Sequence, residues 1–168
     1  MATNNIGDGA IAGAITGFII GLVTIILGLI GLASLASYIN INAVFGGLLP
    51  GFGTVALATI TGLLVFLVFT VIVGLILGAI FGAILEYIPT RSLLTKGVIF
   101  MVAIWVIFGL IIPVIVGASA RLPAGLTATS VLISLIAAVI WGLVLGAALH
   151  WVISRTMAPV RGGVIRTH

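Results

Sequence analysis

Glu86 and His150 are the two ionisable side chains that fall inside the long apolar segments of this sequence. Such groups can relay protons or bind an ion in a membrane, where burying a charge is expensive. The alternative is an interfacial role, because Glu86 lies near Arg91, and His150 lies beside Trp151 and near Arg155. One His and one Glu do not form a bis-histidine haem site or a metal site with several ligands. We expect no metal and no cofactor.

Other catalytic patterns are missing from the sequence. The chain has no cysteine, which excludes thiol catalysis, disulfides and thiolate metal sites. It also has no serine with an adjacent His and Asp, and no glycine and lysine motif that could hold a phosphate. We therefore expect that the protein is not an enzyme.

The composition is that of an integral membrane protein. Of 168 residues, 63% are hydrophobic and 5% are charged, and the mean hydropathy is +1.57. A water-soluble domain of this size could not carry so much apolar surface. The length allows roughly four membrane-spanning helices of about 20 residues each, with no room for a separate soluble domain.

The apolar segments predict an all-α fold, a single transmembrane domain over residues 1–168. Turn-forming Asn, Gly and Pro residues between 38 and 54 separate the first two segments. Pro113 predicts a kink near the end of the third helix. The four predicted spans cover residues 10–38, 55–87, 97–117 and 127–154, and a basic tail covers residues 155–168.

The basic residues predict the orientation of the spans. Four spans place both termini on the same side of the membrane. Five of the six basic residues lie on that side, and Arg121 lies on the other. The five are Arg91, Lys96, Arg155, Arg161 and Arg166. Because cytoplasmic loops are enriched in Lys and Arg, we expect a cell-membrane protein with both termini in the cytoplasm. We expect Arg155, Arg161 and Arg166 to bind lipid headgroups, and no feature indicates nucleic-acid binding.

Two of the predicted helices resemble each other. A shift of 68 residues aligns 11 identical residues within 21 positions, including Gly74 with Gly142 and Gly78 with Gly146. We interpret this as a parallel 2+2 internal repeat, in which each half contributes two helices. Chance matching in a sequence rich in Leu, Ile, Val and Gly is the alternative.

Glycines at four-residue spacing indicate close helix packing. This spacing places small residues on one helix face, where another backbone can approach. The predicted packing residues are Gly9, Gly13, Gly17 and Gly21 in the first helix, Gly74, Gly78 and Gly82 in the second, and Gly142 and Gly146 in the fourth. These faces could pack inside the bundle or against another subunit.

The connector at residues 41–52 is apolar although it lies between spans. Phe45, Leu48 and Phe52 would be costly to expose to water. We expect this segment to be covered by protein or to lie at the membrane interface.

Part of the sequence resembles a known group of membrane proteins. The features that match are the segment from Gly78 to Gly82, Pro89, the segment from Lys96 to Phe100, Trp105 and Pro113. Their pattern resembles small four-helix prokaryotic membrane proteins of unknown function, the YagU-like group among them. The resemblance implies a membrane bundle and no particular chemistry.

We therefore expect a non-catalytic accessory or structural subunit of a larger membrane complex of the respiratory or transport type. The expected partners are membrane lipids and either other subunits or further copies of this chain. The alternative is a small homo-oligomeric channel or transporter that uses Glu86 and His150.

Overall fold

The fold is a bundle of four apolar helices, as the sequence predicts. The computed structural model describes residues 2–32, 60–112, 115 and 128–156. Four helices within these residues are long and apolar enough to cross a membrane. They are α1 (Ala2–Leu29), α4 (Ile60–Ile84), α5 (Leu93–Ile104) with its π-helical continuation η2 (Trp105–Ile111), and α7 (Ala128–Thr156).

Helix α1 begins at residue 2 rather than 10 and ends at Leu29 rather than at 38. It ends because Gly31 adopts a left-handed conformation with φ of 82°. The N–H of Leu32 then donates to the carbonyl of Leu27 at 2.9 Å, and that of Gly31 donates to Gly28 at 3.3 Å. This is a Schellman motif, which terminates a helix wherever Gly supplies the left-handed residue. The apolar run continues past Gly31, so hydropathy placed the end too late.

The other helix ends differ less from the prediction. Helix α4 ends at Ile84 and is followed by a turn, whereas the prediction extended this helix to residue 87. Helix α5 begins at Leu93 rather than at residue 97. Several predictions lie outside the described residues: the covered connector at 41–52 with Phe45, Leu48 and Phe52, the kink at Pro113, and the placement of Arg121, Arg161 and Arg166.

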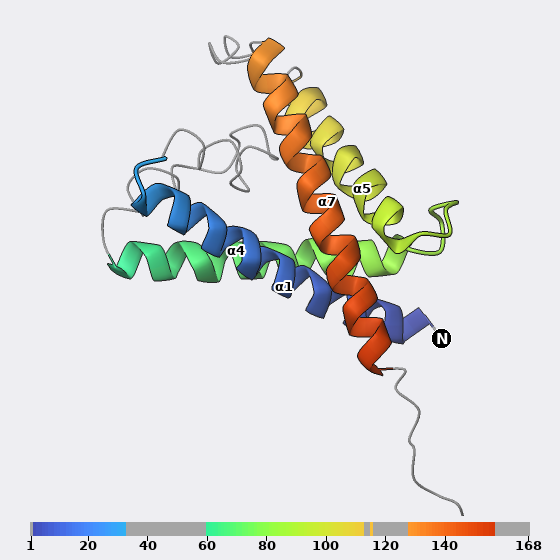
Figure 1. Ribbon diagram of the computed structural model, residues 1–168. Helices are drawn as coiled ribbons and strands as arrows, with labels where there is room; N and C mark the ends of the chain where they lie inside the picture. Colours follow the sequence, from blue (N-terminus) through green and yellow to red (C-terminus); the bar gives the residue numbers. More distant parts are fainter. Residues whose placement is uncertain (1, 33–59, 113–114, 116–127, 157–168) are drawn as a thin grey trace, which may run out of the picture.

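The helices form two antiparallel hairpins that cross each other steeply (Figure 1). One hairpin pairs α1 with α4, the other pairs α5 and η2 with α7, and α7 also contacts α1. The start of α1, the end of α4, the start of α5 and the end of α7 gather on one side of the molecule (Figure 1). We call this side the shared end. The opposite ends of the two hairpins point in different directions.

The hydrophobic core lies where the two hairpins cross. Phe81 of α4 is fully buried, and its ring centroid lies 5.1 Å from that of Phe100 in α5. Ala12 of α1 and Trp141 and Leu149 of α7 belong to the same buried cluster. Dispersion between these closely packed side chains holds the hairpins together in lipid, where the hydrophobic effect gives little drive for helix association.

Candidate functional site

The glycines of α1 and α4 bring two helix backbones into direct contact. A Cβ atom added to Gly13 would lie 2.7 Å from the Cα of Gly78, and one added to Gly78 would lie 2.6 Å from the Cα of Gly13. Gly9 faces Gly78 and Gly82 in the same way, and Gly74 faces Gly17. Since no real Cβ atom tolerates such distances, these positions require glycine.

Threonines continue the α1–α4 contact beyond the last glycine pair. Gly21 packs against the side chains of Thr70 and Leu67. Thr16, Thr24 and Thr70 are buried, and each hydroxyl donates to a backbone carbonyl of its own helix at 2.8 Å. The hydroxyl hydrogens of these three threonines are therefore bonded within their own helices, and at most 3% of each residue is exposed.

The second hairpin repeats the close approach over a shorter length. A Cβ on Gly142 would lie 2.5 Å from the Cα of Val98, and one on Gly146 would lie 2.7 Å from the Cα of Leu94. The 68-residue shift aligns Gly74 and Gly78 with Gly142 and Gly146. The first pair packs against α1, and the second pair packs against α5 in the same way. Gly97 provides the matching small surface on α5.

Beyond Gly97, larger side chains lie between the two helices of the second hairpin. Met101 and Trp105 are buried, and the indole Nε1–H of Trp105 donates to the hydroxyl of Ser134 at 3.0 Å. Trp105 is also the first residue of η2, where the helix widens from α to π geometry. The hydrogen bond between Trp105 and Ser134 was not expected from the sequence, because Ser134 belongs to the apolar segment of another helix.

Glu86 and His150 have different surroundings at the shared end. Glu86 lies in the turn after α4, is exposed, and accepts a hydrogen bond from the Asn5 side-chain amide at 3.2 Å. Helix α7 carries His150 on an exposed surface, although Gly142 and Gly146 on the preceding turns are buried. A four-residue step rotates a helix position by about 40°, so the stripe drifts away from the contact face. The structure therefore does not join Glu86 and His150 into one site.

Lys96 links the two hairpins at the shared end. Its ammonium group donates to the backbone carbonyl of Leu85 at 2.7 Å, immediately after the end of α4. The last carbonyls of a helix lack partners within that helix and carry partial negative charge, so a cation is favourable there. The sequence located Lys96 near a turn but could not identify a carbonyl acceptor.

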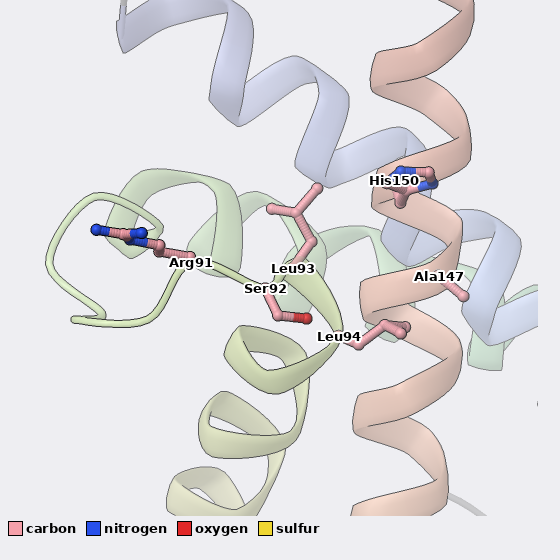
Figure 2. Close-up of a pocket in the computed structure, with 6 residues that line it drawn as sticks. All are labelled: Arg91, Ser92, Leu93, Leu94, Ala147 and His150. Carbon is pink, nitrogen blue, oxygen red and sulfur yellow. The ribbon is translucent and has the colours of Figure 1, made fainter.

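His150 lines an open recess between the start of α5 and the end of α7 (Figure 2). We call it the α5–α7 recess. Its volume is about 490 Å³, and its lining residues are Arg91, Ser92, Leu93, Leu94, Ala147 and His150. Figure 2 shows Arg91 on the loop before α5, with its guanidinium directed away from α5 and α7. The opening thus combines a hydroxyl and an imidazole with apolar side chains, and an arginine whose guanidinium points outward lies at its rim.

Arg155 and Trp151 extend the polar end of α7 beyond the α5–α7 recess. The Arg155 guanidinium carbon lies 4.2 Å from the centre of the exposed Trp151 ring, which is a cation–π contact. Trp and Arg side chains commonly occupy the headgroup level of a bilayer.

Among the described residues, no group of three or more His, Asp or Glu side chains could hold a metal ion. Comparison with curated proteins gives no match, and comparison with solved structures gives none either. No link to the YagU-like group is shown. A family model does match residues 3–160, which is most of the chain. The protein therefore belongs to DUF6789, a family of unknown function.

Proposed function

We propose that the chain is a non-catalytic accessory subunit of a larger membrane complex. The observation that supports this best is the character of the buried polar groups in the helices. Thr16, Thr24 and Thr70 each donate to their own helix and are at most 3% exposed, so packed helices enclose these hydroxyls and leave little of them open to a substrate or a conducted ion. The helices instead provide surfaces on which other helices can pack.

The glycine faces in this proposal hold the chain itself together, because they lie between α1 and α4 and between α5 and α7. A partner subunit would contact the outward faces. Helix α4 offers exposed apolar side chains at regular spacing, including Leu64, Val68 and Ile72. Such a face fits lipid tails or an apolar partner helix equally well.

In the proposed orientation the shared end lies in the cytoplasm of a prokaryotic cell. Arg91 precedes α5, Lys96 lies in the first turn of α5 and Arg155 lies in the last turn of α7, so all three belong to this end. Basic residues are enriched on the cytoplasmic side of membrane proteins, which supports this orientation.

A channel or transporter that uses Glu86 and His150 is a weaker proposal. Both residues lie at the shared end, and Glu86 is engaged by Asn5 whereas His150 faces the α5–α7 recess. A conducting path through the chain would need surfaces open along the membrane depth, whereas the buried Thr16, Thr24 and Thr70 are at most 3% exposed.

Native mass spectrometry of the tagged chain, extracted in mild detergent from its own membrane, tests the subunit proposal. We expect a complex of fixed stoichiometry that contains other polypeptides. A monomer or a closed homo-oligomer would contradict the proposal. Ion flux in proteoliposomes that is lost in both Glu86→Gln and His150→Asn would favour the channel instead.

A further inference from the structure

The α5–α7 recess combines polar side chains with an apolar wall, and a free ion would use only the polar side chains. Ser92 and His150 provide a hydroxyl and an imidazole, and Arg91 lies at the rim with its exposed side chain turned outward. Leu94 and Ala147 are exposed as well and provide an apolar wall. An amphipathic ligand with an anionic head and a hydrocarbon tail would contact both surfaces.

The charge of Arg91 is available to such a ligand. Within the described residues no ion pair engages Arg91, and the nearby carboxylate of Glu86 accepts a hydrogen bond from Asn5. An unpaired guanidinium can bind a phosphate through two parallel N–H donors. The hydroxyl of Ser92 and the imidazole of His150 could add further hydrogen bonds to the same group.

The recess also lies at the correct depth for a lipid headgroup. Tyr87 is 84% exposed near the end of α4, and Trp151 is 47% exposed on α7 directly after His150. Exposed Tyr and Trp side chains at the ends of spanning helices mark the membrane–water interface. Phosphate groups of the bilayer lie at this level, and acyl chains begin just below it.

We propose that the α5–α7 recess is a binding site for an anionic phospholipid. When the lipid binds, the exposed Arg91 side chain turns from its outward position toward the opening and binds the headgroup phosphate, together with Ser92 and His150, and one acyl chain lies along Leu94 and Ala147. This site is separate from the general attraction of lipid expected for Arg155 and the tail. It does not depend on the subunit proposal, because it needs only that the shared end lie at a bilayer surface.

Lipid retention on the purified full-length chain tests this site. Native mass spectrometry would count phosphatidylglycerol and phosphatidylcholine molecules that remain bound to the wild type, Arg91→Gln and Arg155→Gln. Arg155→Gln is the matched control, because it removes the same charge from the same end outside the recess. We expect Arg155→Gln to lower the affinity for phosphatidylglycerol by no more than about fivefold, which is the general attraction of one charge, and Arg91→Gln to lower it by about tenfold or more, because it also removes charged hydrogen bonds to the phosphate.

A second variant tests the shape of the recess without changing charge. Ala147→Trp fills the apolar wall at an exposed position, so we expect reduced phosphatidylglycerol binding with an unchanged circular dichroism spectrum. Equal losses in Arg91→Gln and Arg155→Gln would show diffuse charge attraction and overturn the proposal. Competition by glycerol phosphate or inorganic phosphate as strong as that by the lipid would overturn the lipid assignment. Unchanged binding in Arg91→Gln would also contradict it.

Discussion

Gly78→Ala should weaken the contact between α1 and α4. The added Cβ would lie 2.6 Å from the Cα of Gly13 and 2.8 Å from its backbone nitrogen. Carbon atoms in ordinary contact are about 3.5–4.0 Å apart, so the helices must separate locally by about 1 Å. Backbone atoms cannot move aside as a flexible side chain can. Overpacking of this kind costs about 1–3 kcal/mol.

Gly7→Ala provides the matched control within the same hairpin. A Cβ on Gly7 would have no neighbour within 4 Å, although Gly7 lies in α1 only two positions from Gly9. Alanine is favoured over glycine in a helix by up to about 1 kcal/mol, so this control should be neutral or slightly stabilising. Because both glycines lie in helices, the propensity gain is common to the two variants, and they should differ by the overpacking cost of about 1–3 kcal/mol in unfolding free energy.

The absence of native cysteine allows a direct unfolding assay. Thr24 is 2% exposed in α1, so a Thr24→Cys thiol should react with a labelling reagent mainly after the hairpin opens. Labelling rates across a series of SDS concentrations in mixed micelles would give the unfolding free energy of each variant in this background. Equal stability of Gly78→Ala and Gly7→Ala would refute the close backbone contact.

Three further predictions use the same assay principle. Lys96→Met should destabilise the chain by about 1 kcal/mol, because it removes a partly exposed charged hydrogen bond to Leu85; no change would mean that this link is dispensable. Trp105→Phe and Ser134→Ala should be coupled by about 0.5–1 kcal/mol in a double-mutant cycle, whereas additive effects would show that their hydrogen bond contributes nothing. Gly31→Ala should cost about 1–2 kcal/mol through its left-handed backbone alone, since no atom lies within 4 Å of the added Cβ; an unchanged stability would argue against the Schellman ending of α1.

The fold class could be predicted from the sequence because apolar length and low charge determine how many helices cross a bilayer. The small-residue spacing also predicted a packing face that includes Gly13 and Gly78; in the structure a Cβ on either residue would lie less than 3 Å from the Cα of the other. Helix ends were harder to predict. Gly31 ends α1 through a local backbone conformation within an uninterrupted apolar run, and hydropathy does not detect such a conformation.

The polar contacts at the shared end depend on tertiary structure. Asn5 and Glu86 are 81 residues apart, and Lys96 bonds to a backbone carbonyl whose position follows from the end of α4. The α5–α7 recess likewise joins residues far apart in the sequence, since Arg91 and His150 both line it. Spacing along one helix cannot show such combinations of residues from different helices.

The most direct test of the central claim, four spans with the shared end in the cytoplasm, is accessibility of single cysteines in intact cells. We would place them at Thr3, Ser92 and Thr167 for the shared side and at Arg121 for the opposite side, in the naturally cysteine-free chain. A membrane-impermeant thiol reagent should label the cysteine at 121 and leave the other three unlabelled until the cells are opened. Labelling at 3, 92 or 167 in intact cells would contradict the four-span orientation.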